Sequence, residues 1–361
     1  MAKLISADLA NNNLCILEYS TTDGKMLSIE TDSFDAKIEA HTYTDIGRII
    51  FGTPITKIGD NAFRYCSNLT SVTIPDSVTT IGVRAFSRCT SLKEFKGKFA
   101  SEDGRCLIID GVLNSFAPMG LNEYTIPDSV TTIDRCAFQH CTSLTSVTIP
   151  NSITTIGRSA FSDCSSLTSV TIPDSVTTIY SGAFSYCSSL KEFKGKFASE
   201  DGRCLIVDGV LNSFAPTGLN EYTIPDSVTT IGDSVFGGCS NLTNITIPNS
   251  VTTIGGYVFS DCSSLTSVTI PDSVTTIDRG AFSGCKSLSY LTIGKSVKEI
   301  GRRAFEGCSN IDMIICRATT PPKLYMEFST PTSFEKFKTL VVPTGCEEAY
   351  TKSDWGYYLK E

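Results

Sequence analysis

The chain has 361 residues, of which 41% are hydrophobic and 19% charged, a composition that predicts a folded protein and excludes disorder over most of its length. Its 38 acidic and 30 basic side chains give a net charge of -8 and are spread thinly, so we expect no nucleic-acid partner. No apolar stretch reaches the roughly 18 residues of a membrane span or forms a signal-peptide core, so the sequence predicts no transmembrane segment. Because the chain has only two His residues, we expect neither a metal nor another cofactor.

Residues 1–54 precede a repeat, and we expect them to form a β-rich N-terminal cap. From residue 55 onward the sequence recurs with a period of 23. A phenylalanine marks this repeat at nine positions that are 23 or 52 residues apart, namely Phe63, Phe86, Phe138, Phe161, Phe184, Phe236, Phe259, Phe282 and Phe305. Each gap of 52 is one 23-residue unit plus one 29-residue unit, so residues 55–317 contain about eleven units. A period of this length predicts a solenoid in which stacked units share one core.

Each 23-residue unit predicts two short strands. In the unit that starts at Leu69, Val72 and Ile74 alternate with polar residues, which is typical of a strand with one buried face. Pro75 ends this strand, and residues 78–81 form a second β-like segment. The next residue, Gly82, recurs as Gly or Asp in most units, which favours a left-handed backbone; Tyr180 at the same position means that this conformation is not obligatory or that Tyr180 is strained.

The remainder of the unit predicts a short helix. Ala85, Phe86, Cys89 and Leu92 recur at spacings i, i+1, i+4 and i+7, the apolar stripe of a helix about two turns long. One unit cannot bury such a stripe alone, so we expect neighbouring units to cover it.

Two 29-residue units lack this helical element. The first contains Asp-Gly pairs at 103–104 and 110–111 between apolar stretches, which predict hairpins, and we interpret the unit as a small β-meander on the convex side. Residues 91–133 and 189–231 differ at only two positions, which indicates a recent internal duplication.

Residues 318–361 follow the last repeat and are predicted to form a C-terminal cap. Aromatic side chains are frequent there, and we expect them to seal the open end of the solenoid, although they are also candidate anchors for a partner. They are Tyr325, Phe328, Phe334, Phe337, Trp355, Tyr357 and Tyr358.

Nine of the fifteen cysteines lie three residues after a repeat phenylalanine: Cys66, Cys89, Cys141, Cys164, Cys187, Cys239, Cys262, Cys285 and Cys308. Because coils stack at about 4.8 Å, we expect one buried column of thiols. Parallel side chains in a column are poorly oriented for disulfides, and the chain has no Cys-x-x-Cys pair for a metal.

Few residues suggest catalysis. His140 precedes Cys141, but adjacent helical residues point about 100° apart, and Cys141 belongs to the buried column. The paired carboxylates at 102–103 and 200–201 are near-identical copies in predicted turns, which favours a structural role. We therefore predict no catalytic residues and no enzyme activity.

The strand position between the two buried residues should align along the solenoid into one exposed polar face. We take it as the candidate partner-binding face, although a preference of threonine for strands also explains it. It consists of Thr73, Lys96, Thr125, Thr148, Thr171, Lys194, Thr223, Thr246, Thr269 and Thr292. Because this position contains no Trp, Tyr or Arg, we expect many weak contacts and modest affinity. An ordered threonine array could also template ice, but two lysines and an expected curvature disfavour this.

The pattern Leu-x-x-Val-x-Ile-Pro-x-Ser-Val-x-x-Ile-Gly-x-x-Ala-Phe-x-x-Cys-x-x-Leu resembles the BspA-type leucine-rich repeats of bacterial surface proteins. The segments before and after it are similar to the caps of such proteins from gut Bacteroidales. The resemblance implies an α/β repeat fold: a right-handed solenoid with a parallel β-sheet on the concave face and short helical turns outside, capped at both ends.

The resemblance also implies a non-enzymatic adhesion module at the bacterial cell surface that binds a protein or glycan partner of host or microbial origin. An intracellular scaffold with no extracellular partner is the alternative, favoured by the many free thiols and the missing signal peptide. A carbohydrate- or peptide-cleaving enzyme would need carboxylates clustered in a cap, which the sequence does not show.

Overall fold

The computed structural model describes residues 15–327, 330–331, 334 and 336–359. The chain divides into two compact units: unit 1 comprises the residues up to 164 together with 175–177, and unit 2 comprises 165–174 and the residues from 178 onward. Each unit has its own buried apolar core.

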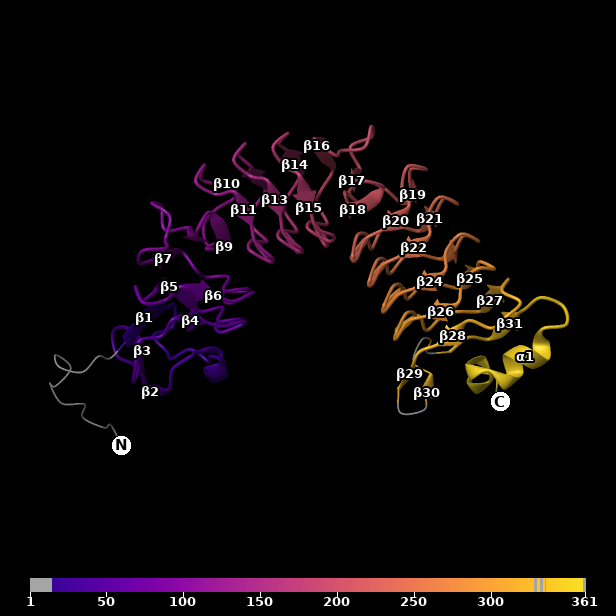
Figure 1. The fold of residues 1–361 in the computed structure, drawn as a ribbon, viewed down its shortest axis with the longest axis horizontal. Coiled ribbons are helices and arrows are strands. Elements are labelled where there is room, and N and C mark those ends of the chain that lie inside the picture. The colour runs from indigo at the N-terminus through magenta and orange to yellow at the C-terminus, as the bar shows by residue number, and fades with distance from the viewer. Residues whose placement is uncertain (1–14, 328–329, 332–333, 335, 360–361) are drawn as a thin grey trace. The chain divides into compact units, whose positions relative to one another are not determined.

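Both units are built from coils that contribute one strand to each of two parallel ladders (Figure 1). The first ladder contains the predicted strand around Val72. Its strands in unit 1 are β5 (Leu69–Thr73), β7 (Glu94–Lys96), β10 (Glu123–Thr125) and β12 (Ser146–Thr148). Its strands in unit 2 are β14 (Ser169–Ile172), β16 (Glu192–Gly195), β19 (Glu221–Thr223), β21 (Asn244–Thr246), β23 (Ser267–Thr269), β25 (Tyr290–Ile293), β27 (Met313–Cys316) and β31 (Thr339–Val341).

The second ladder contains shorter strands, most of them a Thr-Ile pair. In unit 1 these are β4 (Lys57–Ile58), β6 (Thr80–Ile81), β9 (Val112–Phe116), β11 (Thr132–Ile133) and β13 (Thr155–Ile156). In unit 2 they are β15 (Thr178–Ile179), β18 (Val210–Phe214), β20 (Thr230–Ile231), β22 (Thr253–Ile254), β24 (Thr276–Ile277), β26 (Glu299–Ile300) and β28 (Lys323–Leu324). The described residues thus form about twelve coils, and β28 adds one to the eleven units counted in the sequence. The predicted parallel solenoid is confirmed.

The predicted two-turn helix is wrong: the segment from Gly82 to Cys89 forms consecutive tight turns. Ala85 N donates to Gly82 O at 3.3 Å and Cys89 N to Phe86 O at 3.3 Å, while Arg84 and Arg88 have positive φ of 60° and 65°. Other backbone groups of the segment bond to the preceding coil: Gly82 N donates to Ile58 O at 2.7 Å, and Ala85 O accepts from Phe63 N at 2.8 Å. Because stacked coils supply these partners, no i→i−4 bonding is needed, and the apolar stripe is still buried.

The glycine at position 82 is explained by a close contact between coils and not by the predicted left-handed backbone. Neither Gly82 nor Tyr180 has a positive φ, so the left-handed conformation is not required there and Tyr180 is not strained. A Cβ at Gly82 would collide with the backbone of Gly59 and Asp60 in the preceding coil. Close approach to the preceding coil therefore accounts for glycine at Gly82, whereas other coils admit a side chain at this position, as Tyr180 shows.

The 29-residue units form the predicted β-meanders. In unit 1, β8 (Cys106–Ile109) pairs antiparallel with β9 through Asp110 and Gly111, whose φ values are 49° and 77°, as expected for a tight hairpin. Ala100 forms an antiparallel bridge to Leu107. In unit 2, β17 (Cys204–Val207) and β18 repeat this hairpin.

The terminal segments close the ladders within their own units. In unit 1, β1 (Cys15–Thr21) pairs antiparallel with both β3 (Gly47–Phe51) and β5. Strand β2 (Ile38–Tyr43) pairs with the other edge of β3, and the short helix η2 (Thr31–Ser33) lies between β1 and β2 in the sequence. In unit 2, the hairpin β29 (Met326–Glu327) and β30 (Thr330–Pro331), helix α1 (Glu347–Lys352) and η3 (Asp354–Tyr357) follow the ladders. Within the described ranges the longest helix has six residues, too short for a bilayer span.

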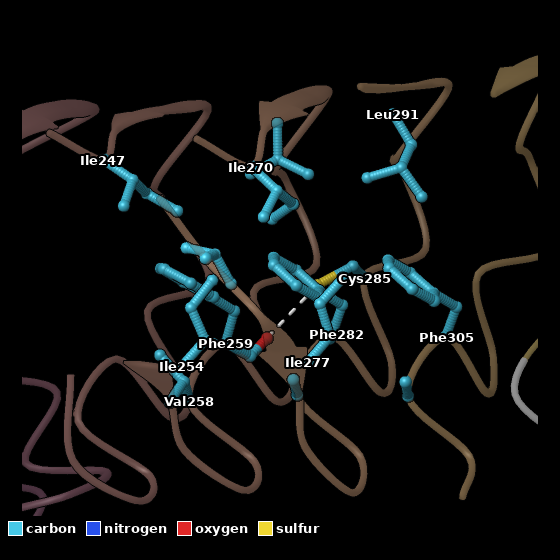
Figure 2. Packing of buried hydrophobic residues seen from close by; sticks show 14 of the residues in the cluster. Ile247, Ile254, Val258, Phe259, Ile270, Ile277, Phe282, Cys285, Leu291 and Phe305 are labelled. Carbon is cyan, nitrogen blue, oxygen red and sulfur yellow. Dashed lines mark hydrogen bonds between the residues drawn. The ribbon is translucent and has the colours of Figure 1, made fainter. Parts of the chain in front are cut away.

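Phenylalanine rings stack through the core of unit 2 (Figure 2). Neighbouring rings in the run Phe236, Phe259, Phe282, Phe305 and Phe334 have centroids 4.7–5.1 Å apart and planes within 16° of parallel. Phe334 belongs to the C-terminal segment, so the stack passes from the repeats into that segment without a break. In unit 1, Phe34 of the N-terminal segment meets Phe63 edge-on at 5.9 Å.

Candidate functional site

The candidate binding face is an in-register row on the first ladder. Thr73 pairs with Lys96 in unit 1, and Thr223 with Thr246 in unit 2. Eight of the ten predicted residues are exposed, and Thr73 and Thr292 are half-buried. The strand residue before each of the ten points into the core, so the next residue points outward. We call this row, with the neighbouring outward residues of the same strands, the ladder face.

The two lysines of the row are held by carboxylates on their own strands. Lys96 Nζ lies 2.9 Å from Glu94 Oε1, and Lys194 Nζ lies 2.7 Å from Glu192 Oε1. The side chains in both pairs are about half exposed, so each ion pair contributes little to stability. The pairing neutralises the two charges that interrupt the threonine row.

The ten predicted positions hold no Trp, Tyr or Arg, but neighbouring outward residues at the C-terminal end of the ladder face do include such side chains. The strand position two residues earlier also points outward, and in β25 it holds Tyr290, which is 55% exposed. Beyond Thr292 the row continues with Ile315 and Val341, which are in register with it and exposed. Arg317 follows directly after β27 and is exposed. The sequence contains this information, because an alignment of both outward strand positions of every repeat shows where these side chains replace the usual polar ones.

A groove of about 430 Å³ lies on the ladder face of unit 2. Its polar lining is Asn244, Thr246, Asn249, Ser267, Thr269, Asp272 and Arg317. Two of the predicted residues, Thr246 and Thr269, are therefore brought together in one concave site, whereas the others lie along the strands outside it.

The predicted column of buried thiols is confirmed: all nine repeat cysteines are buried and free. An unpredicted contact holds several of them. The thiol of Cys285 donates to the carbonyl of Phe259 at 3.2 Å (Figure 2), and Cys89, Cys164, Cys262 and Cys308 make the same bond to the phenylalanine 26 residues earlier. The column thus bonds one coil to the next.

Burial also makes these thiols poor nucleophiles. It raises the pKa of Cys66 to about 11 and that of Cys89 well above its usual range. The thiolate is the reactive form, so thiol chemistry is suppressed along the column.

His140 and Cys141 do not form a catalytic pair. The ring Nε2 of His140 accepts a hydrogen bond from Arg88 Nε at 2.7 Å, and its Nδ1 lies 3.7 Å from Asp163 Oδ2. Burial raises the pKa of the Cys141 thiol well above its usual range. His41 instead bonds through Nε2 to the hydroxyl of Tyr19 at 2.7 Å.

The paired carboxylates stabilise turns. Asp103 Oδ1 accepts from Ser101 Oγ at 2.6 Å and from Arg105 N at 2.9 Å, and Asp201 makes the equivalent bonds in unit 2. These bonds hold the pKa of both aspartates below the usual range in spite of burial, which acts in the opposite direction. Across the described ranges, no group of three or more His, Cys, Asp or Glu side chains is placed to hold a metal ion.

Several aromatic residues of the C-terminal segment pack on the end of the unit 2 core. Trp355 is fully buried, donates from Nε1 to Pro322 O at 2.8 Å, and its ring centroid lies 5.3 Å from that of Phe334. Phe337 and Tyr358 pack against the same core, whereas Tyr325 and Tyr357 are exposed. Phe328 lies outside the described residues.

Comparison with known proteins identifies the repeat. The family model of the BspA type leucine rich repeat region matches residues 36–101, 113–199 and 211–322 with six copies, well over half of the chain. Among solved structures, a leucine rich cell surface protein from Faecalibacterium prausnitzii is 26% identical, with a TM-score of 0.59 over 93% of this chain and 97% of that one. No match is found among curated proteins.

Two further structures share the fold. The pneumococcal vaccine antigen PcpA is 17% identical, with a TM-score of 0.55 over 92% of this chain and 97% of that one. A leucine-rich repeat protein from Eubacterium ventriosum is 22% identical, with a TM-score of 0.51 over 79% of this chain and 70% of that one.

Proposed function

This chain belongs to the BspA-type leucine-rich repeat family, and from that premise we propose that it is a non-enzymatic adhesion module at a bacterial cell surface. It contacts a host or microbial partner along the ladder face. The observation that carries this proposal is the in-register row of exposed residues on the first ladder. The similarity to a cell surface protein from Faecalibacterium prausnitzii supports the location.

The row suits a long or repetitive partner. Each threonine hydroxyl has one hydrogen-bond donor and two acceptor lone pairs, and a threonine recurs at this position in most coils. Individual contacts of this kind are weak in water, but linked contacts raise the overall affinity by multiplicity.

The alternative, an intracellular scaffold, draws its support from the fifteen free cysteines, which suit a reducing compartment. Fourteen of these thiols are buried, and burial raises the pKa of the column members for which a shift is resolved. Such thiols resist oxidation wherever the protein is located. The cysteine content is therefore compatible with the surface location that we propose.

Protease shaving of intact source cells tests the location. We expect mass spectrometry to detect peptides of this protein before any cytoplasmic marker appears. Peptides that appear only after lysis would exclude surface adhesion and favour the scaffold.

Alanine substitution tests the face. The purified chain is immobilised and probed with host matrix proteins and with microbial cells. We expect a variant with Thr125→Ala, Thr148→Ala, Thr223→Ala and Thr269→Ala to lose most of the retained material. The matched control carries Thr90→Ala and Thr142→Ala, which change exposed threonines in the turns instead of the ladder. Equal retention by the two variants would contradict the proposed face.

A further inference from the structure

We propose that the groove on the ladder face of unit 2 binds a carboxylated sugar, with Arg317 holding the carboxylate and Tyr290 beside the sugar ring. This inference rests on the proposed function and narrows it to one ligand class at one place on the face. It is carried by the shape of the groove, its uncompensated charge and the aromatic ring at its border.

The groove has the size and lining of a small-molecule site. Its volume of about 430 Å³ lies within the range of roughly 300–1,000 Å³ that is usual for ligand pockets. Strands β21 and β23 form its floor, and Thr246 and Thr269 project from it. Hydroxyl and amide side chains both donate and accept hydrogen bonds, so this lining matches the hydroxyl groups of a sugar.

Arg317 supplies a positive charge that has no partner among the described residues. Its backbone N–H donates to Ile293 O at 2.9 Å, which fixes the end of β27. Its guanidinium makes no hydrogen bond or ion pair with any residue that the structure describes. A guanidinium binds a carboxylate through two parallel hydrogen bonds, which favours an anionic ligand.

Gly294 allows Arg317 to reach the groove. Strand β25 lies between β23 and β27 in the ladder. Gly294, just after β25, stands where most repeats have a proline. A Cβ at this point would collide with the carbonyl of Pro271. Because glycine has no side chain, Arg317 extends across this coil and lines the groove together with Asp272.

The acidic residue of the groove already has partners. Asp272 Oδ1 accepts from Lys295 N at 3.0 Å, and its Oδ2 lies 3.9 Å from Lys295 Nζ. Both carboxylate oxygens of Asp272 thus face Lys295, whereas the guanidinium of Arg317 is left for a ligand.

Tyr290 provides a flat apolar surface at the border. It lies in register with Ser267 of the groove, points to the same side of the sheet and is 55% exposed. A sugar ring has one face rich in C–H groups, which packs on an aromatic ring while its hydroxyls bond elsewhere. A peptide ligand would instead seek a strand edge or apolar pockets for its side chains, and the polar lining of this groove provides neither.

The test measures calorimetric binding of defined sugars to the full chain. Hexagalacturonate is compared with its methyl ester, and 3′-sialyllactose with lactose, so each pair differs in the carboxylate. We expect at least one acid to bind and its neutral partner to bind at least about ten-fold more weakly. The acid that binds identifies the source of the carboxylate as a uronic or a sialic acid.

Variants locate the site. We expect Arg317→Gln to weaken the acid about ten-fold or more and Tyr290→Ala to weaken both members of the pair. The matched control, Thr90→Ala with Thr142→Ala, changes exposed threonines in turns of unit 1, outside the ladder face, and should leave sugar binding unchanged. Unfolding midpoints of all variants check that each is folded.

Three results would overturn the inference: no binding of either acid, equal binding of acid and neutral sugar, or an unchanged affinity in Arg317→Gln. Equal binding of polyglutamate would also overturn it, in favour of a protein partner attracted by charge. If the immobilised chain retains its partner through the ladder face but binds no acid sugar, the proposed function stands and this inference fails. If neither is bound, both fail.

Discussion

The two units share one repeat but differ in how they make its tight turns. Each turn segment places two residues in the left-handed region, and in unit 1 none of these is glycine: Asn61, Tyr65, Arg84, Arg88, Cys136, His140, Ser159 and Asp163. In unit 2, five of the ten equivalent positions are glycine: Gly182, Gly238, Gly280, Gly284 and Gly307. A residue with a Cβ costs roughly 1 kcal/mol more than glycine in this conformation. Unit 1 therefore stores backbone strain that unit 2 relieves at half of the equivalent positions.

The aromatic core differs in the same direction. The 29-residue coil interrupts unit 1 between Phe86 and Phe138, and Phe86 meets Phe95 edge-on at 5.2 Å. In unit 2 the equivalent coil lies near the start, after Phe184, which meets Phe193 edge-on at 5.4 Å. Five parallel rings from Phe236 to Phe334 then follow one another without interruption. The comparison teaches that the place of the longer coil, as much as the repeat itself, decides where the core is continuous.

Removal of one ring from the continuous stack should have the largest effect. Phe282 is fully buried, with Phe259 at 5.0 Å and Phe305 at 5.1 Å. We expect Phe282→Ala to lower the free energy of unfolding by about 3–5 kcal/mol, because a buried aromatic is lost and a cavity remains. Urea titration followed by circular dichroism gives this value.

The control for this change is Thr171→Ala on the exposed face, which should cost less than about 1 kcal/mol. If Phe282→Ala unfolds at the same urea concentration as the parent, the stacked core does not stabilise unit 2.

Exchange of residues at the left-handed turn positions should have a smaller effect, with opposite signs in the two units. Ser159 has a φ of 55°, so Ser159→Gly should stabilise unit 1 by about 0.5–1 kcal/mol. Gly307 has a φ of 74°, so Gly307→Ser should destabilise unit 2 by about 1 kcal/mol. Hydrogen exchange of peptides from each unit measures both, and shifts of the same sign would contradict the assignment of strain.

Acid should weaken unit 1 first, because both histidines lie there. Burial lowers the pKa of His41. Burial also lowers the pKa of His140, and the positive charges of Arg88, Arg64 and Arg84 act in the same direction, whereas Asp163 raises it. Below the usual histidine pKa of about 6.5, the unfolded chain therefore binds more protons than the folded chain. Stability is thus complete above that pH and declines as the pH falls through it toward the folded-state values.

The measurement is hydrogen exchange at pH 7.5 and 5.5, corrected for intrinsic rates. We expect unit 1 peptides to lose protection at the lower pH and unit 2 peptides to keep theirs. His140→Gln keeps an acceptor for Arg88 and cannot titrate, so it should reduce the loss. Equal losses in the two units would show that histidine is not the cause.

The sequence predicted what the repeat encodes directly. Strand positions, the meanders, the buried thiol column and the solenoid follow from residues that recur in every unit, since a recurring apolar position must be buried by its neighbours. The helix was predicted wrongly because the apolar spacing of Ala85, Phe86, Cys89 and Leu92 is also that of a helix. Hydrogen bonds between coils make helical bonding unnecessary, and the sequence of a single repeat does not reveal them.

The candidate site was predicted in part. The ten ladder residues lie on the first ladder as expected. Tyr290 and Arg317 were not predicted, because the prediction followed only the strand position that recurs as threonine. The reach of Arg317 over Gly294 depends on which coils are neighbours, and that became visible only with the register of the strands.

The near-identical blocks around the two meanders also bear on how such a chain changes length. Residues 91 and 189 stand 98 positions apart, a step of one 29-residue and three 23-residue units. Recombination between the two copies would delete or insert this whole step, and each coil at the new junction would meet the same kind of neighbour as before. Copy number could then vary among descendants in steps of four coils, which would lengthen or shorten the ladder face without a new folding problem.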